Sequence, residues 1–292
     1  MTEADVWTIG RLLEWTKDFL AKHGSDSPRL DAEILLAHAR RCPRIELYTA
    51  FGEEVDERVR STFRELVKQR AKGTPVAYLV GSREFYSLPF AVTPDVLIPR
   101  PETEFLVIRL LDLVKQHFAS GAIEIADVGT GSGILAVCAA IYLPQCNVVA
   151  TDVSEAALEV ARKNAETHGV LDRIDLVVGD LLSAVAADHQ FSFVISNPPY
   201  VSEAEFEELE VQVKDHEPKL ALVGGPHGTE TIERLIPQAI QCLQPGGWLL
   251  LEISPMISTR VSHLLGATGE FTQPRVTHDL AKLPRIVEAQ RR

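Results

Sequence analysis

The sequence has 292 residues, of which 46% are hydrophobic and 24% are charged, a composition typical of a globular protein that at this length favours two domains. The formal net charge of −12 argues against a general DNA-binding protein, because such proteins neutralise phosphates with a basic surface. The four cysteines form no CxxC pair and the nine histidines form no HExxH pattern, so neither a disulfide framework nor a metal site is expected.

The N-terminal stretch, residues 1–80, carries helical signals. It begins without a secretory or transit pattern, and the longest apolar run of the chain, residues 134–143, is far shorter than the roughly 20 residues that span a bilayer. A cytoplasmic protein that does not bind membranes is therefore expected. Apolar residues recur at helical spacing between Ile9 and Leu20, cluster again within 31–40, and return between Val55 and Val67. We predict a small helical bundle for residues 1–80.

Residues 81–104 have a different pattern, with alternating apolar positions, turn residues and several prolines. This pattern predicts a short hairpin followed by a proline-rich bend. We interpret the segment as a linker between two domains, the second of which covers residues 105–292.

From about Phe105 onward, candidate strands alternate with helical stretches. Nearly continuous apolar strands with helical crossovers predict a mostly parallel sheet that is covered on both faces, an α/β fold. Ligands of such sheets bind at the carboxyl ends of the strands. The candidate strands are Glu124–Val128, Val148–Asp152, Ile174–Val178, Phe191–Ser196, Trp248–Ile253, Phe271–Val276 and Arg285–Glu288.

A glycine-rich loop follows the first of these strands. Its sequence, Gly129-Thr130-Gly131-Ser132-Gly133, leads directly into an apolar helical stretch whose first turn presents free N–H groups. Ile134 stands where a dinucleotide fingerprint requires its third glycine, and the loop lacks the lysine of a P-loop. The pattern therefore favours an S-adenosylmethionine loop, in which the glycines pack against the methionine part of the cofactor. The alternative is a tight strand-to-helix turn that binds nothing.

Two acidic residues end the next two strands. Asp152 is placed to accept hydrogen bonds from both ribose hydroxyls of a nucleoside. Asp180 is placed to accept a hydrogen bond from the adenine amino group. Each of them alone is equally consistent with a helix N-cap or a solvated turn residue, but three ligand-type features at successive strand ends favour a nucleoside cofactor.

The fourth strand ends in Asn197-Pro198-Pro199-Tyr200. The two prolines stop the strand, fix two φ angles and remove two donors. The Asn197 side-chain oxygen and the Pro198 carbonyl can then accept both N–H protons of a planar NH2 group, which orients its weakly nucleophilic nitrogen without a strong base. Tyr200 can lie flat against the substrate and favour a sulfonium through a cation–π contact. The alternative interpretation of this segment is a rigid turn without a chemical role.

Taken together, these motifs resemble class I S-adenosylmethionine-dependent methyltransferases that modify planar nitrogens. Within that class the chain is similar to the glutamine methyltransferases of peptide release factors, the PrmC/HemK family, over nearly its whole length. The similarity includes the 81–104 segment, the stretch HEPKLALVGGPHG (residues 216–228) and the C-terminal DLAKLPRIVEA (residues 279–289). Departures from the family pattern occur at His227, at Ser254-Pro255-Met256 and at Ala281-Lys282-Leu283.

The resemblance implies a Rossmann-like, seven-stranded, mostly parallel sheet preceded by a helical domain that grips the protein substrate. It implies N5-methylation of the glutamine amide in the Gly-Gly-Gln loop of class 1 release factors. Separately from the resemblance, we expect the protein to be a monomer. Arg100 to Thr103 are expected to line the pocket as well. The substrate pocket would be formed by Asn197, Pro198, Pro199 and Tyr200. The cofactor contacts would be Gly129, Thr130, Gly131, Ser132, Gly133, Asp152, Asp180, Leu181 and Asn197, with Leu181 where the family often has a Trp.

Two other functions remain open at this point. A DNA or RNA adenine N6-methyltransferase would use the same Asn-Pro-Pro-Tyr segment, but the net charge and the lack of a basic recognition segment argue against nucleic acid as a partner. A regulatory module that binds the cofactor without catalysis would not need the acceptors of that segment.

Overall fold

The computed structural model describes residues 6–118, 121–186 and 188–292. The chain separates into two compact units. The first combines Met1–Ser82 with the short segment Val211–His216, and the second combines Arg83–Glu210 with Glu217–Arg292.

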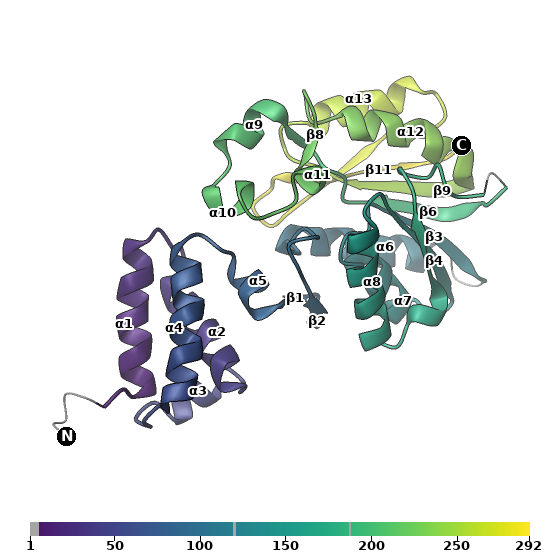
Figure 1. Ribbon diagram of the computed structural model, residues 1–292. Coiled ribbons are helices and arrows are strands. Elements are labelled where there is room, and N and C mark those ends of the chain that lie inside the picture. Colours follow the sequence, from purple (N-terminus) through teal and green to yellow (C-terminus); the bar gives the residue numbers. More distant parts are fainter. Residues whose placement is uncertain (1–5, 119–120, 187) are drawn as a thin grey trace. The chain divides into compact units, whose positions relative to one another are not determined.

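The first unit is a helical bundle (Figure 1). The three helices predicted for the N-terminal stretch are confirmed, although the last of them begins after Val55. Two further helices have only four and five residues, too few to display a helical period. The helices are α1 (Ile9–Lys22), α2 (Pro28–Arg40), α3 (Glu46–Thr49), α4 (Glu57–Ala71), α5 (Val76–Val80) and the later α10 (Val211–Lys214).

Local signals explain where these helices begin and how they pack. The Thr8 hydroxyl accepts a hydrogen bond from the Arg11 N–H at 3.3 Å, and the Asp56 carboxylate accepts one from the Val59 N–H at 3.0 Å. Such N-caps satisfy donors that a helix leaves unpaired at its first turn. The apolar faces then meet in one buried cluster that includes Leu13, Leu35, Leu47 and Phe63.

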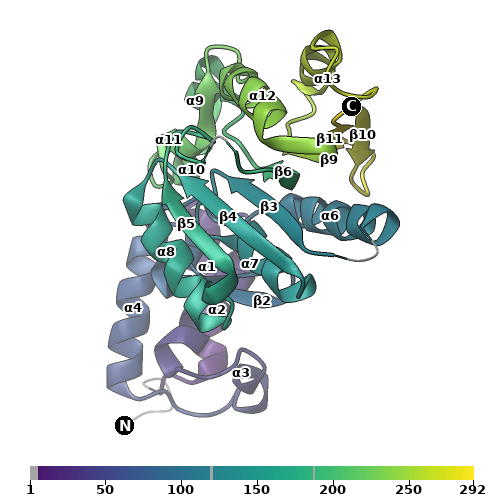
Figure 2. The same ribbon diagram turned by 90° about the vertical axis from the view of Figure 1, so that its right-hand side faces the viewer.

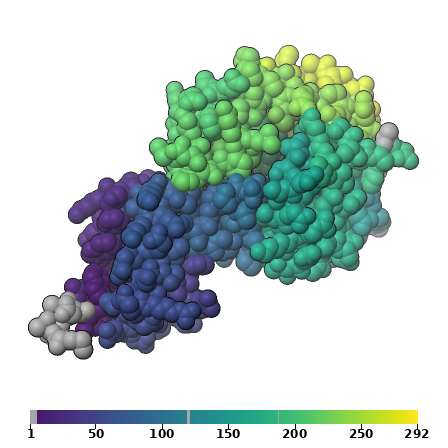
Figure 3. Space-filling view, in the orientation of Figure 1, coloured from purple at the N-terminus to yellow at the C-terminus, as the bar shows by residue number. Residues whose placement is uncertain are grey.

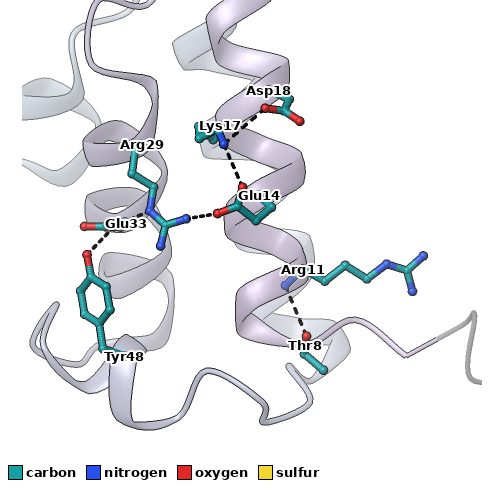
Figure 4. A network of polar contacts seen from close by, with 8 residues as sticks. All are labelled: Thr8, Arg11, Glu14, Lys17, Asp18, Arg29, Glu33 and Tyr48. Atoms are coloured by element: carbon teal, nitrogen blue, oxygen red, sulfur yellow. Dashed lines mark hydrogen bonds and ion pairs between the residues drawn. The ribbon is translucent and has the colours of Figure 1, made fainter.

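A polar network joins α1, α2 and α3 (Figure 4). The Arg29 guanidinium donates to Glu33 at 2.6 Å and also pairs with Glu14 on α1. Tyr48 donates to the same Glu33 carboxylate at 2.6 Å. These donors hold the pKa of Glu33 below its ordinary value even though burial raises it. A carboxylate that is 4% exposed is thereby kept ionised and satisfied.

The predicted hairpin is confirmed as β1 (Ser82–Phe85) paired with β2 (Leu88–Ala91). Its two turn residues, Tyr86 and Ser87, both have positive φ angles, 49° and 60°. This geometry matches the twist of a two-residue hairpin turn. Phe85 and Phe90 are buried in the core of the second unit, so the hairpin from Arg83 onward is part of that unit.

The second unit is built on a seven-stranded sheet with the order β10-β11-β9-β6-β3-β4-β5. The five strands from β9 to β5 are parallel, and β11 and β10 are added in antiparallel fashion. The predicted fold class is therefore confirmed. The strands are β3 (Ile123–Val128), β4 (Cys146–Asp152), β5 (Ile174–Val178), β6 (Phe191–Ser196), β9 (Leu243–Glu252), β10 (Arg275–His278) and β11 (Pro284–Gln290).

Helices cover both faces of this sheet (Figure 2). Side chains of a strand alternate between the two faces, so Ile125 and Phe193 enter one core cluster while Ala126 and Val194 enter the other. The first cluster includes residues of α6 (Glu104–His117), α7 (Ile134–Tyr142) and α8 (Glu155–Thr167). The second includes residues of α12 (Glu230–Cys242) and α13 (Ser258–Ala267).

Three features of the second unit differ from the sequence prediction. The strand expected at Phe271–Val276 begins only at Arg275, because Pro274 lacks an N–H, and Phe271 forms just an isolated bridge with Arg291. Strand β9 begins at Leu243, five residues earlier than predicted, and continues through a proline and two glycines. The short parallel pair β7 (Val201–Ser202) and β8 (Val223–Gly225) was not predicted.

Candidate active site

Strands β3 and β6 are neighbours at the centre of the sheet, although β4 and β5 come between them in the chain. The chain runs outward from β3 to β5 and then returns to the other side of β3. Such a reversal leaves a crevice at the carboxyl ends of the two central strands, where open α/β sheets bind ligands. The glycine loop after β3 and the Asn-Pro-Pro-Tyr turn after β6 both lie at this crevice.

The three glycines of the loop adopt left-handed backbone conformations, with φ angles of 71° at Gly129, 55° at Gly131 and 80° at Gly133. A Cβ at Gly129 or Gly131 would meet no atom within 4 Å, so these two positions border open space. A Cβ at Gly133 would lie 3.0 Å from the Cβ of Ala161 on α8. Gly133 therefore permits close packing of the helices, while the other two glycines leave room beside the backbone.

A fully buried carboxyl is hydrogen-bonded to the glycine loop and to the helix that follows it. Asp127, the second-last residue of β3, accepts hydrogen bonds from the Thr130 hydroxyl at 2.6 Å and from the Ala136 N–H at 3.1 Å. Burial raises the pKa of Asp127 to about 7, although these two donors oppose the rise. The loop is thus tied to its strand by a group that titrates near neutrality.

Asp152 is connected directly to the loop. One of its carboxylate oxygens accepts from the Gly131 N–H at 2.9 Å, and the other accepts from the Ser154 N–H at 2.9 Å. A carboxylate oxygen has two lone pairs, so both oxygens keep a site for a further donor such as a ribose hydroxyl.

Asp180 has a different environment. Its exposed carboxylate pairs with the Arg234 guanidinium, which also lines the crevice. The next residue, Leu181, adopts a left-handed φ of 57°, a conformation that costs a non-glycine residue about 1–2 kcal/mol. Its position at the cavity is therefore maintained against a local preference, which is common at binding sites.

The Asn-Pro-Pro-Tyr turn is fixed by side chains from several elements. The Ser196 hydroxyl donates to the Val128 carbonyl at 2.7 Å, which ties the end of β6 to the end of β3. The half-buried Asn197 donates from Nδ2 to the Thr103 hydroxyl at 3.2 Å. The Tyr200 hydroxyl donates to Glu252 at 3.4 Å. The side-chain oxygen of Asn197 is thus not the atom that Thr103 contacts.

The glycines of the 216–228 stretch pack directly on this turn. A Cβ at Gly224 would lie 2.3 Å from the Pro199 carbonyl oxygen, and a Cβ at Gly228 would lie 2.4 Å from the Tyr200 carbonyl oxygen. Real Cβ atoms do not approach so closely, so only glycine fits at either position. In the space-filling view the green segments that follow residue 217 lie against the teal segments of the same unit (Figure 3).

Glu217, from the same stretch, anchors the proline-rich bend. It is 5% exposed, accepts from the Ile98 N–H at 3.1 Å and pairs with the Arg100 guanidinium at 2.5 Å. A buried carboxylate with two such partners is satisfied and holds the 95–103 segment at the crevice.

These elements enclose a cavity of about 240 Å³. Most of the predicted site residues line it, as do Arg100 and Thr103 of the proline-rich bend. Gly133, Pro198 and Tyr200 are outside its lining. The predicted residues in the lining are Gly129, Thr130, Gly131, Ser132, Asp152, Asp180, Leu181, Asn197 and Pro199.

The sequence analysis missed several residues that shape the site. Asp127 and Glu252 are acidic residues within otherwise apolar strands, a signal that could have revealed both. Glu252 is 2% exposed, and burial raises its pKa to about 7. Asn164, also buried, donates to the Ser132 carbonyl at 2.8 Å from the middle of α8, and no pattern in the sequence indicates that contact.

Within the described ranges, no cluster of His, Cys, Asp or Glu side chains is suited to hold a metal ion. In that same part of the chain, none of the helices combines the length and apolar character needed to cross a bilayer.

The residues at the crevice fit S-adenosylmethionine. The open space beside Gly129 and Gly131 would admit the methionine part, and the remaining lone pairs of Asp152 suit the ribose hydroxyls. The exposed side chain of Val153 and that of Leu181 line the cavity and offer apolar surface to an adenine ring. The absence of a basic residue in the glycine loop suits a ligand without a diphosphate.

Comparison with known proteins shows the family. Residues 11–81 match the family model "PrmC N-terminal domain", and residues 106–214 match "Methyltransferase small domain". A release factor glutamine methyltransferase of Rhodopirellula baltica is 48% identical over 98% of this chain and 97% of its own length. The chain belongs to the release factor glutamine methyltransferase family. A second relative of that name, from Koribacter versatilis, is 40% identical over 89% of the chain and 90% of its own length.

Membership of the release factor glutamine methyltransferase family confirms the resemblance found in the sequence. The protein is an S-adenosylmethionine-dependent protein glutamine methyltransferase. Among solved structures, the N-terminal domain of human METTL16 in complex with SAH has a TM-score of 0.54 at 18% identity and covers 94% of both chains. At that identity the likeness concerns the fold alone.

Proposed function

We propose that this enzyme methylates the N5 nitrogen of the glutamine side chain in the Gly-Gly-Gln loop of class 1 peptide release factors. The main support is that the glycine loop and Asn197 line one cavity, at the crevice between the carboxyl ends of β3 and β6. The relatives from R. baltica and K. versatilis carry the name release factor glutamine methyltransferase, and they match the chain over nearly all of its length.

The chemistry requires a planar amide nitrogen to act as a nucleophile. S-adenosylmethionine, when bound, supplies an electrophilic methyl carbon on a sulfonium sulfur. The Asn197 side-chain oxygen and the Pro198 carbonyl accept the two amide N–H groups, orient the nitrogen, and stabilise the positive charge that develops on it. Once methylated, the amide nitrogen would lose one of its two protons to water. Tyr200 remains our candidate for the apolar wall beside the substrate.

The two domains would have different roles, one in binding the protein substrate and the other in catalysis. We propose that the helical domain, residues 1–80, holds the release factor outside its Gly-Gly-Gln loop. Residues 81–104 would link that domain to the catalytic domain, residues 105–292. The enzyme would act as a monomer that binds no nucleic acid.

One assay tests the substrate. Purified enzyme and labelled S-adenosylmethionine are incubated in turn with a release factor, with the same factor carrying Gln→Ala in its Gly-Gly-Gln loop, and with DNA or RNA. We expect label on the unmodified factor alone, located at the glutamine N5 by mass spectrometry. Label on nucleic acid but not on the factor would instead support an adenine N6-methyltransferase.

A further inference from the structure

A chain of polar groups joins the half-buried Asn197 to the buried Thr103 and Glu252. Asn197 Nδ2 donates to Thr103 Oγ1 at 3.2 Å, and Thr103 has no exposed surface. The Thr103 hydroxyl lies beside the Glu252 carboxyl and lowers its pKa, against the larger effect of burial. Tyr200 donates to the same carboxyl from the end of the Asn-Pro-Pro-Tyr turn at 3.4 Å.

Local secondary structure does not account for the side-chain hydrogen bonding of Thr103 or of Glu252. Thr103 is the N-cap of α6, yet its side chain accepts no capping hydrogen bond, which is the usual role of threonine there. Glu252 ends β9, and its Oε2 is buried without a hydrogen-bond partner among the residues the structure describes. A buried acceptor left unpaired is costly, so the arrangement is not one that folding alone would favour.

The direction of the hydrogen bonds decides which end of the Asn197 amide is free. A carboxamide has an acceptor at one end and a donor at the other, and a half-turn exchanges them. The Thr103 hydroxyl has a single proton. An ionised Glu252 can only accept, so it draws that proton and leaves the Thr103 oxygen to accept from the Asn197 nitrogen.

We propose that Thr103 and Glu252 are positioning residues that fix the Asn197 carboxamide with its oxygen, and not its nitrogen, toward the substrate amide. The identity of that substrate rests on the proposed function, but the orientation itself does not. A flipped Asn197 would present its NH2 group to the N–H groups of the glutamine, donor against donor, and turnover would be lost.

Protonation of Glu252 reverses the direction of these hydrogen bonds. The carboxyl can then donate to Thr103, which turns the threonine proton toward Asn197. Burial raises the pKa of Glu252, and repulsion from Glu102 adds to the rise. Thr103, Tyr200 and Arg285 oppose it, and the resulting pKa is about 7. The active orientation should therefore be populated above about pH 7 and lost as the pH falls through that value.

The first test compares Thr103→Val, which removes the hydroxyl but keeps the shape, with Thr103→Ser, which keeps the hydroxyl. Thr16→Val is the matched control, because Thr16 is also fully buried and its hydroxyl has no hydrogen-bond partner among the described residues. The readout is the side-chain 1H–15N signal of Asn197 in the free protein, assigned by its absence from Asn197→Asp. We expect faster proton exchange of this signal in Thr103→Val but not in Thr103→Ser or Thr16→Val.

With a methyl acceptor present, Thr103→Val should lose about tenfold or more in kcat, equivalent to about 1.4 kcal/mol, with KM largely unchanged. Thr103→Ser should recover most of that loss. If Thr103→Val kept the wild-type Asn197 signal and kcat, or if the two Thr103 variants were equally impaired, the proposal would be wrong.

The second test uses Glu252→Gln, which cannot ionise. In the wild type the Asn197 signal should shift with a midpoint near pH 7, and kcat/KM should fall below that pH. Both effects should vanish in Glu252→Gln. A wild-type Asn197 signal that did not titrate between pH 5 and 9 would overturn the proposal even if Thr103→Val failed to fold. Because the spectra need no methyl acceptor, an error in the proposed substrate would leave this result intact.

Discussion

The glycine loop and the Asn-Pro-Pro-Tyr turn end neighbouring parallel strands, but they are built in opposite ways. The loop makes room: Gly129 and Gly131 have positive φ angles and border open space. The turn is filled: Gly224 and Gly228 press against its backbone, and Asn197 is bonded to Thr103. Each is also supported by a buried carboxyl whose pKa is raised to about 7, Asp127 in one case and Glu252 in the other.

Under the proposed function, the two halves of the site would obtain their specificity in different ways. A cofactor-binding loop needs backbone shape, which a few residues in a row can supply. A turn that orients an amide needs hydrogen-bond acceptors held in one direction, and that requires contacts from several distant segments. Damage to the loop should therefore weaken cofactor binding, while damage to the turn should lower turnover.

The largest effect is expected for Asn197→Ala. Removing one oriented acceptor should lower kcat by about 10²–10³-fold, with affinity for S-adenosylmethionine largely retained. Steady-state kinetics with a release factor and calorimetric titration of the cofactor measure the two quantities. Asn147→Ala serves as the control, since Asn147 lies exposed near the start of β4 and its side chain donates to Glu124. A wild-type kcat in Asn197→Ala would refute the role of this side chain.

Asp127, the buried carboxyl bonded to the glycine loop, should make the free energy of unfolding depend on pH. The pKa of Asp127 is raised from 3.8 to about 7 in the folded state, so the folded protein binds this proton more tightly than the unfolded chain does. Its contribution to stability is present below about pH 4 and is lost as the pH rises through 7.

Between pH 5 and 8 this loss should amount to about 2–3 kcal/mol, and Asp127→Asn should remove it. Urea unfolding of the wild type and the variant at both pH values measures the difference. Equal pH slopes in the two proteins would show that Asp127 is ionised at neutral pH at no cost.

The close contact between Gly224 and the turn predicts a smaller effect. In Gly224→Ala the new Cβ would meet the Pro199 carbonyl oxygen at 2.3 Å, so the turn must move. We expect a loss of about 1–3 kcal/mol in the free energy of unfolding and a kcat that falls more than the cofactor affinity does.

Gly266→Ala is the control for this change. Gly266 lies within α13, where an added Cβ meets no atom within 4 Å, and alanine there should stabilise the helix by about 0.5–1 kcal/mol. If both variants kept full activity and stability, the turn would be more adaptable than the contacts indicate.

The smallest effect is expected for Gly131→Ala. The substitution adds a methyl group to open space beside the loop, at a φ of 55°. Gly169→Ala is its matched control, because Gly169 has a φ of 67° and is equally unobstructed. Both variants should lose similar stability, but only Gly131→Ala should raise the Kd for S-adenosylmethionine, by about tenfold or 1.4 kcal/mol. Equal affinities in the two variants would place the cofactor away from Gly131.

Much of the fold could be predicted because its signals are local. Helical spacing located α1, α2 and α4, and apolar runs located β3 to β6 to within two residues at either end. The predictions failed where a pattern is short or is altered by tertiary pairing. Helix α3 has only four residues, Pro274 delays the start of β10, and β7 exists only because it pairs with β8 from further along the chain.

The sequence by itself determined the motifs whose chemistry lies in consecutive residues. Alternating glycines require unusual φ angles, two prolines stop a strand, and both effects act through the backbone of the residues concerned. The tertiary structure decided what stands beside those motifs: Thr103 at Asn197, Gly224 at Pro199, and Glu252 at Tyr200. It also decided which carboxyls are buried and so carry raised pKa values. Burial and hydrogen-bond direction depend on neighbours that are distant in the chain, and only folding brings those neighbours together.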